Sequence, residues 1–140
     1  MKLSEALRKG CEGKQQIQTW QFGMDGQTPF NYLPRNPDGT IDHEATKGIT
    51  GCCAMGAIAL GCADGFTAPV ESDKTSAAVG FGETHLIRQV TGVDIANIRV
   101  DTLPAYNIGR THDLDCAITR LNDNGWSFEQ IIGWLESIGQ

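Results

Sequence analysis

Residues 51–63, Gly-Cys-Cys-Ala-Met-Gly-Ala-Ile-Ala-Leu-Gly-Cys-Ala, form the stretch of sequence that decides the fold. All of these residues are small or apolar, and a helix that is apolar on every face is buried. Its internal glycines, Gly56 and Gly61, each cost about 1 kcal/mol relative to alanine in an exposed helix. Close packing of a neighbouring backbone would offset this cost. The sequence therefore predicts a buried central helix over residues 51–63.

The composition around this stretch is that of one globular domain. The chain has 140 residues, of which 40% are hydrophobic and 20% charged, and we expect a single domain over residues 1–140. The 17 Asp and Glu residues outnumber the 11 Lys and Arg residues, which makes an acidic protein with a net charge of −6. The basic residues are scattered. A nucleic-acid partner is not expected, because phosphate binding requires a concentrated basic face.

The apolar runs and the cysteines favour a cytoplasmic location. Charged side chains interrupt residues 1–10, which therefore lack the apolar core of a signal peptide. The longest uncharged run, residues 48–63, is shorter than the roughly 20 apolar residues that cross a bilayer, so no membrane partner is expected. The 5 cysteines include no Cys-x-x-Cys pair, which argues against a secreted disulfide framework and favours a reducing compartment.

The segment before the central stretch predicts one helix and a long loop. Small or apolar residues at positions 3, 6, 7, 10 and 11 indicate an N-terminal helix with Ser4 as its N-cap. Residues 17–22 indicate a short strand or an apolar anchor. Residues 23–48 are rich in turn signals and are predicted to form a loop, with a hairpin at Asp38-Gly39 as one option.

The segment after it ends in the clearest local pattern of the chain. A helical stripe over residues 114–121 stops at Asn122-Asp123-Asn124-Gly125, and a second helix follows at once. Ser127 and Gln130 have the spacing of a capping box at the start of that helix. Two helices joined by so short a connection form an αα-hairpin.

These elements predict a mainly α fold. It is a small single-domain helical bundle around the central Gly/Ala/Cys-rich helix, with the C-terminal αα-hairpin, long loops and short β-strands. A further helix over residues 83–90 and a short strand within residues 93–100 belong to the same prediction. An α+β fold is the alternative.

Three segments together resemble a family of small uncharacterised bacterial and phage proteins. They are the amphipathic N-terminal helix with its Trp20 segment, the motif Cys53-Ala54-Met55-Gly56-Ala57, and the run from Leu121-Asn122-Asp123 through Trp126-Ser127 into the last helix. That family is a domain of unknown function, marked by a Cys-x-x-Gly-Ala motif and an Asn-Asp step before the C-terminal helix. The resemblance leaves out residues 23–48 and 64–110. It implies a small helical domain, often encoded on phages or other mobile elements, and no activity.

Cys53 is the candidate catalytic residue. The N–H groups and the dipole at a helix N-terminus stabilise a thiolate and lower the pKa of a cysteine. A cysteine nucleophile also needs a general base and a residue that orients the base. His112 is the preferred base, with His85 as the alternative, and Asp123 is the preferred orienting residue, with Asp113 and Asn122 as alternatives. In the opposing interpretation, Cys53 is a small packing residue in a buried helix.

His112 and Cys116 also form a candidate metal site. They are spaced i, i+4, so on a helix both face the same side, and Asp115 or Cys52 would complete the ligand set. Zinc sites usually combine two short spacings, and this chain offers one. No metal is therefore predicted.

The loops and the Asn-Asp step hold the remaining candidates. Tyr106, Asn107 and Arg110 are polar or aromatic loop residues and are candidate ligand-binding residues. Asn122-Asp123 has two interpretations. Either it is a turn that caps the last helix, or it places Asp123 in a pocket beside the cysteine helix.

The sequence favours a non-enzymatic binding or interaction domain of phage or mobile-element type, with an unknown protein or small-molecule partner. The first alternative is a cysteine-dependent hydrolase or transferase that uses Cys53 with His112. The second is a metal-binding domain. No cofactor is predicted.

Overall fold

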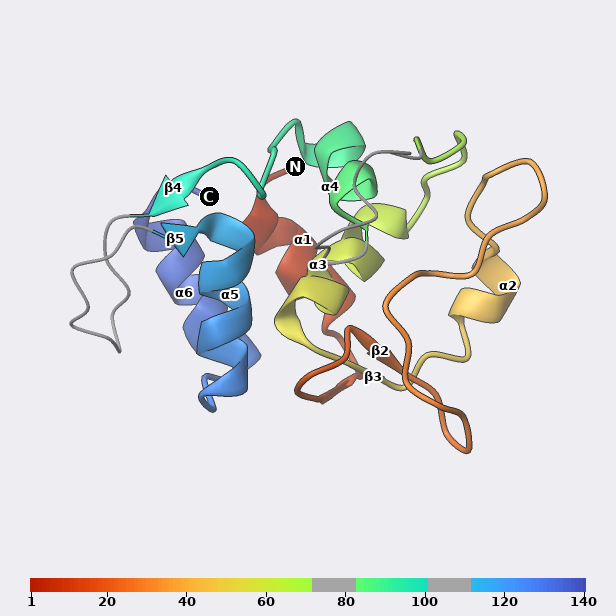
Figure 1. Ribbon diagram of the computed structural model, residues 1–140, viewed down its shortest axis with the longest axis horizontal. Helices are drawn as coiled ribbons and strands as arrows, with labels where there is room; N and C mark the ends of the chain where they lie inside the picture. Colours follow the sequence, from red (N-terminus) through yellow and green to blue (C-terminus); the bar gives the residue numbers. More distant parts are fainter. Residues whose placement is uncertain (72–82, 101–111) are drawn as a thin grey trace.

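Helix α3 (Ala54–Ala63) lies at the centre of the molecule (Figure 1). In this computed structural model, which describes residues 1–71, 83–100 and 112–140, every residue of α3 except Leu60 is buried, as predicted. The helix begins at Ala54 and not at residue 51, because Gly51 and Cys52 form strand β3 (Gly51–Cys52). This strand pairs with other strands on both sides, and those backbone hydrogen bonds hold it extended.

The described part of the chain contains six helices and five short strands. The helices are α1 (Leu3–Gly10), α2 (His43–Thr46), α3 (Ala54–Ala63), α4 (Thr84–Thr91), α5 (Leu114–Asp123) and α6 (Phe128–Ser137). The strands are β1 (Gln15–Gln16), β2 (Phe22–Gly23), β3 (Gly51–Cys52), β4 (Arg99–Val100) and β5 (His112–Asp113). In a small mixed sheet, β3 lies between β1, which is parallel to it, and β2, which is antiparallel, while β4 and β5 form a separate antiparallel pair. The mainly α prediction is confirmed.

Helix α1 packs on α3 with the two backbones in direct contact. A Cβ atom at Gly10 would lie well within 3.0 Å of the carbonyl oxygen of Ala57. A Cβ atom at Gly61 would likewise lie well within 3.0 Å of the carbonyl oxygen of Ala6. Only glycine therefore fits at positions 10 and 61. The close approach brings many backbone atoms into van der Waals contact, which offsets the helical cost of glycine as expected for Gly61.

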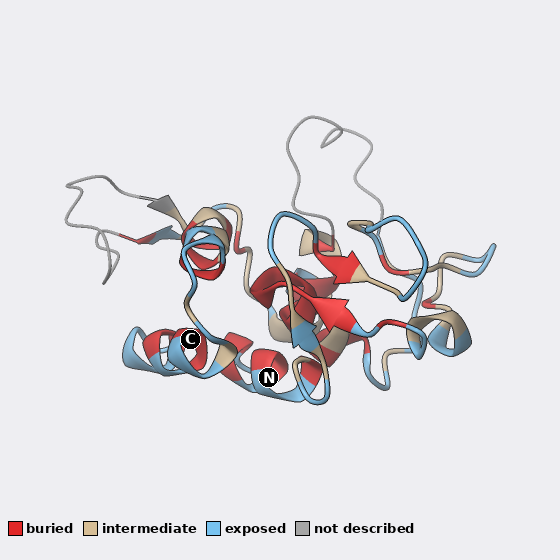
Figure 2. Ribbon diagram, turned by 90° about the horizontal axis from the view of Figure 1, so that it is seen from below, coloured by how far each residue is buried: buried red, intermediate tan, exposed pale blue. Residues whose placement is uncertain are grey.

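The N-terminal helix differs from the prediction at its first turn. Its N-cap is Lys2, and Ser4 lies inside the helix. Ser4 bonds instead to the last residue of the chain. Its backbone N–H and its hydroxyl donate to the carbonyl oxygen of Gln140 at 3.0 and 3.2 Å. Arg8 on α1 also pairs with Glu136 on α6 at 2.7 Å. Helices α1 and α6 therefore lie side by side (Figure 2).

The C-terminal αα-hairpin is confirmed. Helices α5 and α6 are joined at Asn124 to Ser127, and the predicted capping box is formed. The hydroxyl of Ser127 accepts the N–H of Gln130 at 3.2 Å, and Oε1 of Gln130 accepts the N–H of Ser127 at 2.9 Å. Two of the free N–H groups at the start of α6 are thereby satisfied.

Residues 23–48, which are rich in turn signals and predicted to form a loop, contain the short helix α2. Asp42 caps it by accepting the N–H of Ala45 at 3.1 Å. Before it, Arg35 and Ile41 form an antiparallel bridge around the predicted turn at Asp38-Gly39. Ile41 is buried, so this segment is anchored on the core and is not a free loop.

One cluster of buried apolar residues unites these elements. Side chains from α1, α3, α4, α5 and α6 meet in it, together with residues from the segment before α2. The described residues thus form one domain around a single core (Figure 2). Within the described ranges, no helix combines the length and the apolar character needed to cross a bilayer.

Candidate functional site

Cys53 is the N-cap of α3. Its backbone is extended, and its Sγ accepts the N–H of Gly56 at 3.4 Å. Its own N–H donates to the carbonyl oxygen of Gln21 at 3.1 Å. The predicted position of Cys53 at a helix start is therefore where the structure places it, one residue after β3. With 7% of its surface exposed, the residue is almost enclosed.

Gly56 fits against the same part of the chain as Cys53. A Cβ atom at position 56 would lie well within 3.0 Å of the carbonyl oxygen of Gln21. This explains two positions of the Cys-x-x-Gly-Ala motif, since Cys53 caps the helix and Gly56 admits the Gln21 backbone. The third position, Ala57, lies where α1 crosses at Gly10.

Asn122 provides a second cap for α3 from a distant part of the sequence. Its Oδ1 accepts the N–H of Ala54 at 2.9 Å and the side-chain amide of Gln16 at 2.8 Å. Its Nδ2 donates to the carbonyl oxygen of Ile17 at 2.9 Å. The expectation that the Asn-Asp step caps the last helix is thus wrong for Asn122, because this side chain is 2% exposed and turns inward to the central helix.

Gln16 extends this hydrogen-bond network to the start of α6. Its Nε2 donates to the carbonyl oxygen of Trp126 at 2.7 Å, and its Oε1 accepts the N–H of Phe128 at 3.1 Å. Sequence reasoning missed Gln16, because no local pattern pairs it with residues more than a hundred positions away. Gln16 and Asn122 together hold β1, α3, α5 and α6 in register.

A cavity of about 140 Å³ opens beside this capped helix start. It is lined by Thr19, Gln21, Asn31, Cys53, Thr119, Asn122 and Asp123, and we name it the Cys53 pocket. The backbone at one edge is strained, since Thr19 has a φ of 74°, in the left-handed region that β-branched residues rarely adopt. Strain of this kind concentrates at functional sites.

Two polar side chains of the Cys53 pocket lack hydrogen-bond partners. Gln21 is only 3% exposed, and neither Oε1 nor Nε2 of its amide has a partner. The hydroxyl of Thr119, on the neighbouring α5, is buried and unpartnered as well. Buried polar groups are normally satisfied, and each unsatisfied one costs about 1–3 kcal/mol. Sequence reasoning missed both residues, since glutamine and threonine carry no positional signal for a pocket.

The environment of Cys53 keeps its thiol protonated. Burial is the largest cause and raises the pKa of Cys53 above the ordinary value, with a further increase from the charge of Asp123. The N–H groups of Gly56 and Met55 act in the opposite direction but do not outweigh burial. The helix N-terminus therefore does not produce a thiolate at neutral pH, which a cysteine nucleophile requires.

The predicted catalytic residues are only partly brought together. Cys53 and Asp123 line the same pocket. His112 belongs to β5, which precedes α5, whereas Asp123 is the last residue of α5 (Figure 1). At about 1.5 Å per residue, the helix places the two backbones roughly 15 Å apart. The alternative base, His85, lies on α4, and its Nδ1 is 3.1 Å from Arg88.

The remaining predicted site residues belong to a loop and to the candidate metal site. Tyr106, Asn107 and Arg110 fall in residues 101–111, outside the described residues. The Sγ of Cys116 and carboxylate oxygens of Asp113 and Asp115 lie within 4.8 Å of one another. However, the carboxylate of Asp115 accepts the N–H of Cys116, and that of Asp113 pairs with Arg99. Both carboxylates thus have a partner within the chain.

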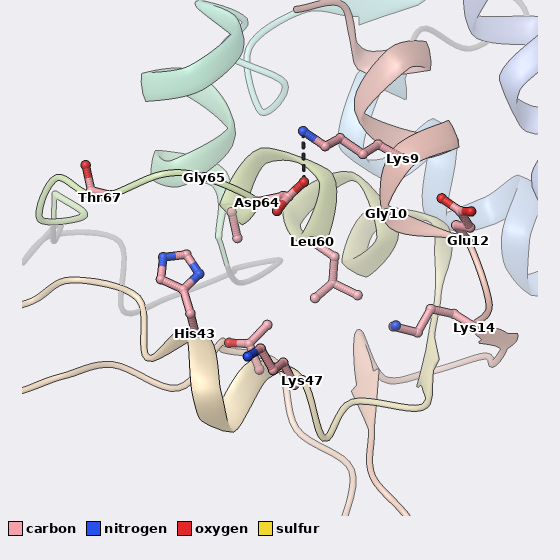
Figure 3. Close-up of a pocket in the computed structure, with 12 residues that line it drawn as sticks. Lys9, Gly10, Glu12, Lys14, His43, Lys47, Leu60, Asp64, Gly65 and Thr67 are labelled. Carbon is pink, nitrogen blue, oxygen red and sulfur yellow. Dashed lines mark ion pairs between the residues drawn. The ribbon is translucent and has the colours of Figure 1, made fainter.

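A larger open cavity of about 500 Å³ lies on another side of the molecule (Figure 3). Lys9, Lys14, Lys47 and His43 surround it, with Leu60 at its floor. Two of the ammonium groups are already paired, Lys9 with Asp64 at 3.0 Å and Lys47 with Glu44 at 2.8 Å. The cavity also lies at the C-terminal ends of α1 and α3, where helix dipoles favour cations over anions. The ammonium groups of Lys9 and Lys47 are thus accounted for by carboxylates of the chain itself.

No protein-family model, curated protein or solved structure matches this chain. The function must therefore be argued from the geometry of the chain itself. Among the described cavities, the Cys53 pocket is the one in which buried polar groups stand unpartnered.

Proposed function

We propose that this protein is a non-enzymatic binding domain and that the Cys53 pocket holds a small ligand. The observation that carries the proposal is at Gln21, a residue of the pocket lining whose side-chain amide is buried and unpartnered. A ligand that bonds to this amide recovers the free energy lost when the amide was buried. The rigid, doubly capped start of α3 provides a fixed wall for such a ligand.

Two observations favour binding over catalysis. The raised pKa of Cys53 leaves a neutral thiol, and Asp123, the charged residue of the lining, raises that pKa further. Among the described residues, the lining contains no histidine, and the backbone of His112 lies at the opposite end of α5. A hydrolase or transferase that used Cys53 with His112 would have to move one of them along the length of this helix.

We further propose membership of the family marked by the Cys-x-x-Gly-Ala motif and the Asn-Asp step, with the cytoplasmic location and mobile-element origin that the resemblance and the cysteine pattern imply. The structural roles of the motif residues support this assignment. Cys53, Gly56 and Asn122 all act on one feature, the N-terminus of α3.

The proposal is tested by screening a library of small neutral and charged fragments against the isotope-labelled protein by NMR. Saturable shifts confined to the resonances of Gln21, Cys53 and Thr119 are expected for a subset of fragments. A Gln21→Leu variant should fold and lose those shifts. If no fragment moves these resonances, the pocket holds only water and the proposal fails.

A second measurement separates binding from catalysis. Iodoacetamide at pH 7 should label Cys53 no faster than Cys62, because burial raises the pKa of both thiols. Half-buried Cys11 and Cys116 should react first. Rapid, selective labelling of Cys53 would support the enzyme instead.

A further inference from the structure

We infer that the ligand of the Cys53 pocket is a primary amide or urea, a planar group that presents an N–H donor beside a carbonyl acceptor. This inference rests on the proposed function and names the chemical class that the site takes. It is carried by the hydrogen-bonding capacity of the unpartnered groups, by the charge of the lining and by the volume of the cavity.

The unpartnered side chain of Gln21 has the hydrogen-bonding capacity of a primary amide. Gln21 offers one acceptor and one donor on the same planar group, and both ends lack a partner. A ligand that satisfies both ends must itself present a donor next to an acceptor. The argument holds for either orientation of the Gln21 amide. Thr119 adds a hydroxyl that donates or accepts as the ligand requires.

Several other groups around the pocket are already engaged. Asn122 uses its amide on α3, β1 and Ile17, and Oδ1 of Asn31 accepts the N–H of Gln21 at 3.1 Å. The thiol of Cys53 accepts from Gly56. The buried and unpartnered polar atoms of the described lining therefore belong to Gln21, which lies before β2, and to Thr119 on α5.

The charge of the lining selects against anions. Asp123 is the charged residue of the lining in the described part of the chain, and its charge raises the pKa of the Cys53 thiol. A carboxylate or phosphate ligand would meet this negative charge and would leave the Oε1 acceptor of Gln21 unsatisfied. A guanidinium or amidinium would suit Asp123 but would leave the Nε2 donor of Gln21 unsatisfied. An amide or urea avoids both penalties.

The volume fits a ligand of a few heavy atoms. Because one water occupies about 30 Å³ of liquid, a cavity of about 140 Å³ holds four or five such volumes. This is the size of acetamide, or of the terminal amide of an asparagine or glutamine side chain. Exposed Thr19 and Asp123 lie at the rim, so an amide can enter either as a free molecule or on a peptide.

Three nearly isosteric probes test the inference on the full-length protein. Acetamide carries a donor and an acceptor, acetate two acceptors, and acetamidinium donors only, so shape is constant while hydrogen bonding changes. NMR titration at pH 7 and constant ionic strength should give acetamide an affinity roughly tenfold or more above that of the other two, since each leaves a buried partner unsatisfied. A capped glutamine peptide, titrated in parallel, distinguishes a side-chain amide from a free one.

Variants of the pocket sharpen the test. Thr119→Val removes an unpartnered hydroxyl at constant shape, so it should weaken acetamide binding without unfolding the protein. Thr91→Val, which removes a hydroxyl on α4 that donates to the carbonyl of Ile87, is the control and should leave acetamide binding unchanged. Gln21→Glu should reverse the preference towards acetamidinium, because the carboxylate accepts only.

The outcomes separate this inference from the function on which it rests. Equal or tighter binding of acetate or acetamidinium to the native protein would overturn the amide class while leaving a ligand-binding pocket. Acetamide binding that survives Thr119→Val and Gln21→Leu would place the amide elsewhere and also overturn the inference. If neither these probes nor the fragment library shift the pocket resonances, the proposed function fails as well.

Discussion

The Oδ1 atom of Asn122, at the end of α5, accepts the N–H of Ala54, the first residue of α3, at 2.9 Å. Cys53 satisfies a second N–H of the same helix from within, through its thiol and the N–H of Gly56. The central helix is thus capped twice, once by its own sequence and once by the C-terminal hairpin. Because the four N–H groups at a helix start need partners, this shared cap couples the hairpin to the core.

Asn122→Ala should lower the free energy of unfolding by about 2–4 kcal/mol. The substitution leaves the N–H of Ala54 and the carbonyl of Ile17 without partners, and each unsatisfied buried group costs about 1–3 kcal/mol. Chemical denaturation measures the loss. Asn124→Ala removes a nearby exposed asparagine and should change stability by less than about 1 kcal/mol. Equal effects of the two variants would contradict the proposed cap.

Gly56→Ala and Gly133→Ala should have opposite effects on stability, although both replace a helical glycine. At position 56 the new Cβ would overlap the carbonyl of Gln21, so a loss of several kcal/mol or a failure to fold is expected. At position 133, on α6, nothing lies within 4 Å of the new atom, so alanine should stabilise the protein by up to about 1 kcal/mol. Thermal unfolding of both variants is the measurement, and a destabilised Gly133→Ala would contradict this account.

Glu83→Gln should destabilise the protein by about 2–4 kcal/mol. The buried carboxylate pairs with Arg35 at 2.6 Å and accepts the N–H of Leu33 at 2.8 Å, so it joins the segment before α2 to the start of α4. Removing its charge leaves a partly buried guanidinium unpaired.

Glu44→Gln is the matched control for this prediction, because its ion pair with Lys47 is exposed. It should cost at most about 1 kcal/mol, and its effect should shrink in high salt. Urea denaturation at low and high ionic strength compares the two variants. A cost for Glu83→Gln as small as that of Glu44→Gln would show that the buried pair does not anchor the segment.

Stability should fall with rising pH above about 9, because of the buried thiols. Burial raises the pKa of Cys62 to about 12, whereas the unfolded thiol titrates near its ordinary value. Between these two values the unfolded state loses its proton and the folded state keeps it. The stabilisation is complete below pH 9, and each such thiol subtracts up to about 1.4 kcal/mol per pH unit above it.

Cys62→Ala should therefore make the dependence of unfolding free energy on pH shallower between pH 9 and 11. Cys11→Ala is the control, since that thiol is half buried and its pKa is raised less by its surroundings, so a smaller change is expected. Denaturant unfolding at several pH values gives both slopes. An unchanged slope for Cys62→Ala would show that its thiol is hydrated in the folded state.

Local sequence patterns predicted the elements whose causes are local. The apolar character of residues 54–63 identified the buried helix, and the capping box at Ser127 and Gln130 identified the start of α6. The first three residues of the predicted central helix were wrong, because strands from distant parts of the chain hold residues 51 and 52. Ser4 failed as a cap for a similar reason, since its partner is Gln140.

The candidate site depended still more on long-range geometry. Cys53 and Asp123 could be singled out because cysteine at a helix start and an Asn-Asp step are recognisable patterns. Gln21 and Thr119 could not, because their importance comes from what they lack, a hydrogen-bond partner, and this is a property of the folded molecule. The inward turn of Asn122 was hidden in the same way.

The backbone and the side chain of Gln21 have separate roles. Its backbone is locked, with its carbonyl against Gly56 and bonded to the N–H of Cys53, while its side chain is free of intramolecular bonds. Exchange of this one side chain therefore need not disturb the scaffold. If the Cys53 pocket binds a ligand as proposed, position 21 is a place where natural variation or engineering can change selectivity while the architecture stays fixed.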